Sequence, residues 1–155
     1  MNIAVVGLGF VGLSISSVLA SKNYNVVGID IDNQKCSDIR NGVLPLFEPG
    51  LENTLRVGLK KKLIISNNFS LIKNCNMIFV TVGTPQKSNG AIELSMIKAA
   101  ITSIGRIIAK SKNNPIILIK STVTPGTIQN IILPILEKRS GKKACLLYTS
   151  DAADE

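Results

Sequence analysis

The chain of 155 residues contains no histidine and no tryptophan, and only 4% of its residues are aromatic. The absence of histidine excludes Ser-His-Asp and Cys-His nucleophilic sites, histidine acid–base catalysis and histidine metal ligands. The three cysteines, Cys36, Cys75 and Cys145, have neither the spacing of a metal site nor the density of a disulfide scaffold. We therefore expect reduced thiols and no metal centre.

Long hydrophobic runs are also lacking. The longest apolar stretches, such as residues 77–82 and 116–119, are far shorter than a membrane span. The first residues enter an apolar strand-like run with no signal-peptide pattern before it. These features predict a cytoplasmic protein with no membrane partner.

Acidic residues are fewer than basic ones, 10 against 18, which gives a formal charge of +8. This excess raises the possibility of a nucleic-acid binder, but the lysines are spread along the chain apart from residues 60–62, and aromatic stacking platforms are scarce. Residues 60–62 end a predicted helix, where cations complement the helix dipole. We favour a solvated basic surface that attracts anionic nucleotides, and expect no nucleic-acid partner.

Apolar runs alternate with helical patterns along most of the chain. Strands are predicted at residues 2–6, 25–30, 62–66, 76–82 and 115–121, and helices at 10–22, 33–41, 50–60, 68–73, 93–111 and 126–138. The strands are continuously apolar, which is typical of a parallel sheet covered on both faces. The pattern predicts an α/β fold with a Rossmann-like, doubly wound parallel sheet. Isoleucines at helical spacing in residues 97–108 should belong to its core.

Three glycines follow the first predicted strand in the pattern G-x-G-x-x-G. Gly7 permits a tight turn, Gly9 lets the backbone approach a pyrophosphate, and Gly12 allows close packing between helix and strand. The N-terminus of the helix would face the phosphates. We also assign Phe10 and Val11, which lie between the last two glycines, to the cofactor site.

An acid, Asp30, ends the second predicted strand eighteen residues after Gly12. It would accept hydrogen bonds from both ribose hydroxyls of a dinucleotide, and its charge would repel the 2′-phosphate of NADP. The combination predicts an NAD site. The alternative is a βαβ unit whose glycines serve packing alone.

Two further loops follow predicted strands, at the edge where doubly wound folds bind ligands. Residues 82–85 read Val-Gly-Thr-Pro and residues 120–126 read Lys-Ser-Thr-Val-Thr-Pro-Gly. Their hydroxyl groups could bond the ribose, the phosphates or the nicotinamide amide. Turn and capping chemistry alone would also explain these residue types.

Five segments in order resemble the N-terminal domain of the UDP-glucose and GDP-mannose dehydrogenase family. They are residues 5–13, 28–32, 47–51, 82–85 and 120–127, and the resemblance extends from residue 1 to about 144. Phe-Glu-Pro-Gly-Leu at 47–51 and Lys-Ser-Thr-Val-Thr-Pro-Gly-Thr at 120–127 are its narrowest motifs. The resemblance assigns the adenosine ribose to Asp30 and Lys35, the cofactor path to Val82, Gly83 and Thr84, and the nicotinamide to Ser121 and Thr122.

The resemblance also implies an activity. Such enzymes oxidise the C6 alcohol of a nucleotide sugar, here expected to be UDP-glucose, to a carboxylate with two NAD, through a cysteine-bound intermediate. UDP-N-acetylmannosamine and GDP-mannose remain alternative substrates, and a free-standing NAD-sensing regulatory module is an alternative function. The catalytic cysteine and lysine would lie in later domains of a homo-oligomeric enzyme, so this chain would hold no catalytic residue and be inactive alone. Cys36 and Cys75 are then structural thiols.

The last residues, 145–155, resemble the translation of a sequencing adapter. We therefore expect an NAD-binding domain over residues 1–144 followed by a non-native tail, with a sheet that lacks its final strand or strands. A genuine, divergent terminus is the alternative.

Overall fold

A computed structural model describes residues 1–45 and 48–143 of the chain. Its centre is a sheet of five parallel strands in the order β3-β2-β1-β4-β5. The strands are β1 (Asn2–Val6), β2 (Asn25–Ile29), β3 (Leu63–Ser66), β4 (Met77–Val80) and β5 (Ile116–Ile119). The α/β fold and all five predicted strands are therefore confirmed, although the last two strands are shorter than predicted. The expected tail lies outside the described residues.

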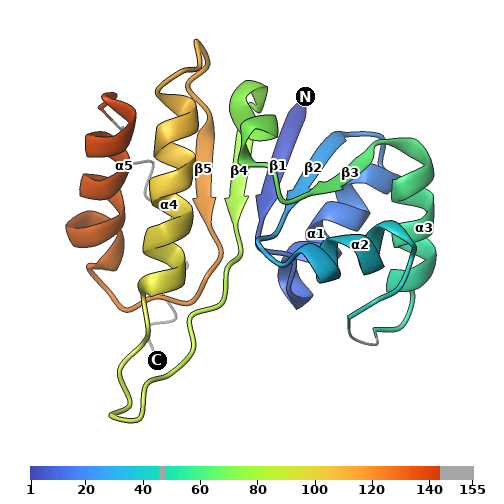
Figure 1. Ribbon diagram of the computed structural model, residues 1–155, viewed down its shortest axis with the longest axis horizontal. Helices are drawn as coiled ribbons and strands as arrows, with labels where there is room; N and C mark the ends of the chain where they lie inside the picture. The colour runs from blue at the N-terminus through green and yellow to red at the C-terminus, as the bar shows by residue number, and fades with distance from the viewer. Residues whose placement is uncertain (46–47, 144–155) are drawn as a thin grey trace.

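Helices connect the strands and cover both faces of the sheet (Figure 1). They are α1 (Phe10–Ser21), α2 (Asn33–Arg40), α3 (Leu51–Lys61), the 3-10 helix η1 (Phe69–Asn74), α4 (Ser95–Ile108), the π-helical turn η2 (Ile128–Ile132) and α5 (Leu133–Ser140). In β1, Val5 joins the hydrophobic core beneath α1 and α3, whereas Ala4 and Val6 join the core beneath α4. Because both faces are buried, the strands are continuously apolar.

Two helical segments differ from the sequence prediction. Residues 68–73 were expected to be α-helical, but the 3-10 helix η1 forms there, over Phe69–Asn74. The predicted helix at 126–138 begins as the π turn η2, in which the N–H of Leu133 bonds the carbonyl of Ile128, and continues as α5 to Ser140. Pro134 lies directly after this turn and has no N–H to donate, which disfavours a regular α-helical ladder through this point.

The isoleucine stripe of α4 lies in the core as predicted. Ile97, Ile101, Ile104 and Ile108 are all at most 4% exposed. Residues of η1 and α5 pack against the same face of α4. In the described ranges, no helix has both the length and the apolar character needed to cross a membrane.

All five strands point the same way, so their carboxyl ends meet at one edge of the sheet (Figure 1). The glycine turn, Asp30 and the two hydroxyl loops follow β1, β2, β4 and β5 at this edge. The C-terminal ends of α1, α3, α4 and α5 lie at the opposite edge, where the strands begin. The two edges therefore differ in the residues they present.

Candidate cofactor site

The turn between β1 and α1 requires a glycine at its first position. Gly7 has φ +98, and its N–H donates to the carbonyl of Ile29 at 2.8 Å. A Cβ at Gly7 would lie 2.8 Å from the carbonyl oxygen of Thr81. Both the positive φ and the contact exclude a side chain here, as the sequence predicted.

The other two glycines have different surroundings. A Cβ on Gly12 would lie 1.8 Å from the carbonyl oxygen of Gly7 and 2.5 Å from Thr81 Oγ1, which donates to that oxygen at 2.7 Å. A Cβ on Gly9 would meet nothing within 4 Å. Gly12 therefore serves the contact between helix and turn, whereas Gly9 leaves open space in front of the N-terminus of α1. The packing role predicted for Gly12 is confirmed, and the pyrophosphate role of Gly9 stays a prediction.

Asp30 lies at the end of β2 and is 8% exposed. Its Oδ2 accepts hydrogen bonds from the N–H of Leu8 at 2.8 Å and from Lys35 Nζ at 3.0 Å, while its Oδ1 accepts from the N–H of Asp32 at 3.0 Å. A carboxylate has about four acceptor positions. Three are occupied within the protein, so Asp30 has room for one ribose hydroxyl rather than the two that we expected.

Lys35 is placed beside Asp30 by the start of α2. The side chain of Asp32 caps this helix and accepts from the N–H of Lys35 at 3.0 Å. This cap orients the first turn so that Lys35 Nζ reaches the carboxylate of Asp30. An ammonium group with three donors can bond Asp30 and still donate to a ligand hydroxyl.

Hydroxyl groups join the two loops that follow β4 and β5. Thr84 Oγ1 donates to the carbonyl of Thr122 at 2.8 Å, and Ser121 Oγ donates to the carbonyl of Val82 at 2.7 Å. These bonds fix the loops to each other, which is the turn chemistry that we considered as an alternative. They do not exclude a ligand role, since each hydroxyl oxygen keeps acceptor positions.

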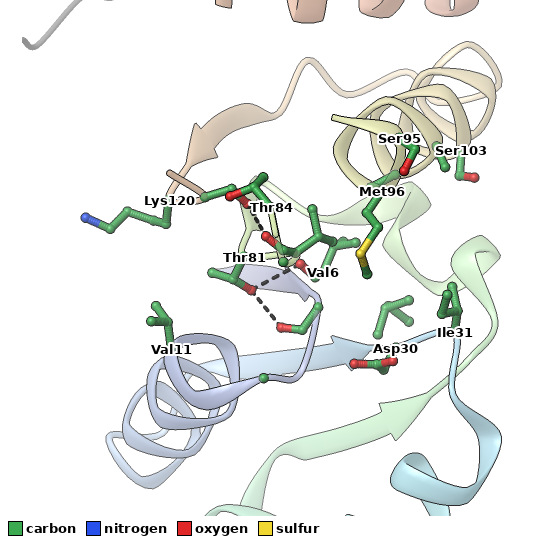
Figure 2. Close-up of a pocket in the computed structure, with 18 of the residues that line it drawn as sticks. Val6, Val11, Asp30, Ile31, Thr81, Thr84, Ser95, Met96, Ser103 and Lys120 are labelled. Carbon is green, nitrogen blue, oxygen red and sulfur yellow. Dashed lines mark hydrogen bonds between the residues drawn. The ribbon is translucent and has the colours of Figure 1, made fainter. Parts of the chain in front are cut away.

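These parts surround one cavity of about 760 Å³ at the carboxyl edge of the sheet (Figure 2). Eleven of the twelve predicted site residues line it: Gly7, Gly9, Phe10, Val11, Asp30, Lys35, Val82, Gly83, Thr84, Ser121 and Thr122. Gly12 does not, because it is buried against the glycine turn. The structure thus brings together residues from four separate loops.

The cavity also has a wall that the sequence analysis missed. Ser95, Ala99 and Ser103 lie on it at intervals of four residues along α4, together with Met96. Their small side chains occupy a different face of the helix from the isoleucine stripe, and this spacing was a readable signal. The rest of the unpredicted lining consists of Val6, Ile29, Ile31, Phe69, Thr81, Ala100 and Lys120. Figure 2 shows Met96 and Asp30 on facing sides of the cavity.

The first turn of α4 is fixed by an acid. Glu93 Oε1 accepts from the N–H of Ser95 at 2.9 Å, and Glu93 Oε2 pairs with Lys87 Nζ at 3.2 Å. The bond from the Ser95 N–H, followed by the bond from Lys87, lowers the pKa of Glu93. The charged form of Glu93 therefore fixes the first turn of α4, which carries Ser95 and Met96 of the cavity wall.

The residues present fit a dinucleotide. The N-terminus of α1 faces open space beside Gly9, so its unpaired N–H groups can bind phosphate. Asp30 and Lys35 offer an acceptor and donors for a ribose, and the cavity has the size of a cofactor site. Within residues 1–45 and 48–143, no three histidine, cysteine or acidic side chains gather as a metal site would require.

Both described cysteines are buried, as expected for structural thiols. Burial raises the pKa of Cys75, and burial is also the largest cause of the raised pKa of Cys36. Cys36 Sγ lies 3.5 Å from the backbone carbonyl of Asp30 and donates to it. A raised pKa keeps a thiol protonated at neutral pH, which does not suit a nucleophile. Cys145 lies outside the described residues.

A parallel doubly wound sheet with a glycine turn, an acid after β2 and a cavity across the strand ends defines a dinucleotide-binding domain. Residues 1–152 match the model of the UDP-glucose/GDP-mannose dehydrogenase family, NAD binding domain, and the chain belongs to this family. The cofactor of the domain is NAD. The family expected from the sequence is thereby confirmed.

Curated relatives carry two substrate names. The chain is 40% identical over 146 residues to a GDP-mannose 6-dehydrogenase of Pseudomonas syringae. This alignment covers 93% of the chain and 33% of the relative. It is 31% identical over 143 residues to a UDP-glucose 6-dehydrogenase of Haloferax volcanii. That alignment covers 92% of the chain and 33% of the relative. The chain therefore spans about one third of the length of these relatives.

Solved structures give the same result. A crystal structure of a ternary complex of GDP-mannose dehydrogenase from Pseudomonas aeruginosa superimposes with a TM-score of 0.89 at 34% sequence identity. The match covers 92% of this chain and 33% of that one. Fold and family therefore agree over the same part of the dehydrogenase.

Proposed function

We propose that this chain is the NAD-binding part of an enzyme that oxidises the C6 alcohol of a nucleotide sugar to a carboxylate with two NAD. The observation that carries the proposal is the shared cavity: the glycine turn, Asp30 and the two hydroxyl loops all line it. NAD, when bound, supplies the acceptor for hydride. The residues of this chain bind and orient the cofactor.

Each part of the cavity has a proposed task. The N–H groups beside Gly9, at Phe10 and Val11, would bind the pyrophosphate. Asp30 would accept from one hydroxyl of the adenosine ribose, and Lys35 would donate to the other. On the opposite side, Val82, Gly83 and Thr84 would line the path of the cofactor, and Ser121 and Thr122 would contact the nicotinamide end.

The substrate proposal needs a choice. UDP-glucose was the expectation from the sequence, but the relatives named as GDP-mannose 6-dehydrogenases reach 40% identity, against 31% for the relative named for UDP-glucose. Identity in a cofactor domain reports common descent rather than sugar contacts, because the sugar site requires other parts of the enzyme. On the ground of common descent, we propose GDP-mannose first and retain UDP-glucose as the second candidate.

Calorimetric titration of NAD tests the cofactor site. Wild type and Asp30→Ala should differ in Kd by at least about tenfold, because the substitution removes a charged ribose acceptor. Asp38→Ala is the matched control: Asp38 is also an acid of this region, but it bonds Gln34 and does not line the cavity. Equal binding by all three proteins would contradict the proposed site.

The substrate is tested in the whole dehydrogenase that contains this domain. Supplied with GDP-mannose or UDP-glucose, it should release two NADH per sugar with the true substrate. The 155-residue chain alone should oxidise neither sugar. Turnover by the isolated chain would refute the division between a binding part and a chemical part.

A further inference from the structure

The fold separates the charges of the molecule, although the basic residues are spread along the sequence. The edge that carries the amino ends of the strands collects the C-terminal ends of the helices (Figure 1). Basic residues on this edge include Lys22 after α1, residues 60–62 at the end of α3, and Lys73 in η1. Bases that are spread along the sequence therefore gather on one edge of the fold.

The same edge continues across α4 and α5. Arg106, Lys110 and Lys112 lie at the end of α4, and four more bases lie within residues 138–143 at the end of α5. Eleven of these twelve bases are exposed and Lys142 is half-buried. We call this set the basic edge.

Acids are nearly absent from it. Of the seven acids in the described residues, only Glu137 lies on the basic edge. The other six acids are matched by the six remaining bases, and the ion pairs of Lys35, Arg56 and Lys87 all lie in that second set. The whole net positive charge of the described chain is therefore concentrated at the edge opposite the cofactor cavity.

Helix capping explains only part of this set. Lys61 Nζ donates to the carbonyl of Ser21 at the end of α1, at 3.1 Å. Lys142 Nζ donates to the carbonyls of Ser111 and Asn113, each at 2.9 Å. A complement to the helix dipole needs one or two cations in each last turn, and α3 and α5 each carry more than that in and just after it.

Exposed apolar side chains lie among these bases. Tyr24, Ile64, Leu71 and Ile116 are 39%, 56%, 41% and 50% exposed, and each lies beside the amino end of a strand or in η1. The other strongly exposed apolar residues include Phe10, Val11, Ile31 and Met96, which line the cofactor cavity. Exposed apolar groups thus gather at a ligand site and at the basic edge.

The basic edge also contains a cavity of about 490 Å³. It is lined by Lys61 and Lys62, by the amide side chains of Asn2, Asn25 and Asn74, and by aliphatic residues that include Ile64 and Leu71. Cations and amides bind phosphate oxygens, and aliphatic walls suit the glycerol and upper acyl carbons of a lipid. The combination fits one amphiphile with an anionic head.

We propose that the basic edge docks the protein on an anionic phospholipid bilayer, in place of our expectation from the sequence that the protein has no membrane partner. A cluster of exposed lysines attracts anionic headgroups, and separate aliphatic side chains enter the boundary between headgroups and acyl chains. Single-stranded nucleic acid is less favoured, because binding without sequence preference uses aromatic stacking and Tyr24 is the one aromatic residue on the described part of this edge. Docking at this edge leaves the cofactor cavity open toward solvent.

Vesicle co-sedimentation of the 155-residue chain tests the proposal. We expect binding to vesicles of phosphatidylcholine mixed with phosphatidylglycerol, weakening as salt is raised, and little binding to phosphatidylcholine alone. Binding that ignores lipid charge and salt would overturn the proposal, as would no binding. Tighter binding to a DNA or RNA oligonucleotide than to the anionic vesicles would also overturn it.

Two matched variants locate the surface. Lys62→Gln/Lys73→Gln/Lys110→Gln removes three charges from the basic edge and should weaken vesicle binding by at least about tenfold. Arg40→Gln/Arg56→Gln/Lys98→Gln removes three charges elsewhere and should change binding less than about threefold. Equal losses in both would overturn the location. Circular dichroism checks folding, and the wild-type salt and lipid series decides the proposal if a variant does not fold. The outcome is independent of NAD binding.

Discussion

The backbone N–H of Leu8 donates a 2.8 Å hydrogen bond to the carboxylate of Asp30, 22 residues further along the chain. The bond is buried and joins the glycine turn after β1 to the end of β2. The two ends of the proposed cofactor cradle, one for phosphates and one for the ribose, are therefore a single hydrogen-bonded unit. Asp30 serves the fold as well as the ligand.

This link predicts a stability effect at Asp30. Asp30→Asn must place its amide NH2 either opposite the Asp32 N–H or opposite the Leu8 N–H and Lys35, so at least one donor loses its partner. We expect the free energy of unfolding to fall by about 1–3 kcal/mol, measured by urea denaturation. Asp38→Asn, on the exposed side of α2, should change it by less than about 0.5 kcal/mol. An equal loss of unfolding free energy in both variants would contradict a stabilising role for the buried bond between Leu8 and Asp30.

The pair of Asp30 and Lys35 predicts how the cofactor preference can be changed. Lys35 Nζ lies 3.0 Å from Asp30 Oδ2 and lines the cavity. Asp30→Asn removes the charge that repels a 2′-phosphate and frees the ammonium group of Lys35 to bind it. Titration should show the ratio of NADP affinity to NAD affinity rising by about tenfold or more. The gain should disappear in Asp30→Asn/Lys35→Met; a gain that persists there would show that Lys35 is not the phosphate ligand.

Local signals predicted the parts of the site that depend on local geometry. Gly7, Gly12 and Asp30 have the surroundings that their spacing indicated, because a turn, a close contact and a strand end are short-range features. The wall formed by α4 was missed because its small residues face the cavity only once α4 packs against β4.

The ends of the strands were the less predictable part of the fold. The run at 76–82 suggested a longer β4, but Thr81 turns its hydroxyl to the carbonyls of Val6 and Gly7. The run at 115–121 ends early for a related reason: the N–H groups of Lys120 and Ser121 share the carbonyl of Val80. Apolar composition cannot indicate where a ladder gives way to such loop contacts.

The buried thiol of Cys75 predicts a dependence of stability on pH. Burial raises its pKa in the folded state above the ordinary value of 9.0, so the folded state favours the neutral thiol. This contribution is fully present below pH 9 and is lost as the pH rises through the folded pKa. The difference in unfolding free energy between wild type and Cys75→Ala should therefore shrink from pH 8 to pH 10.5, measured by urea denaturation under reducing conditions. A constant difference would contradict the prediction, since the cavity left by alanine does not titrate.

The two glycines that flank the start of α1 predict opposite outcomes for the same substitution. Gly9 has φ −73 and open space at its Cβ position, so Gly9→Ala should fold with nearly wild-type stability. Its methyl group would instead occupy the space that we assign to the pyrophosphate, and NAD affinity should fall by about tenfold or more.

Gly12→Ala should behave in the reverse order, because its methyl group overlaps the carbonyl oxygen of Gly7 and forces the helix away from the turn. The free energy of unfolding should fall by about 2–4 kcal/mol, and cofactor binding should be lost with the fold rather than before it. Thermal unfolding with and without NAD separates the two effects: Gly9→Ala should keep its melting temperature but lose the shift that NAD causes in wild type. A wild-type NAD shift in Gly9→Ala would mean that the pyrophosphate does not bind at this turn.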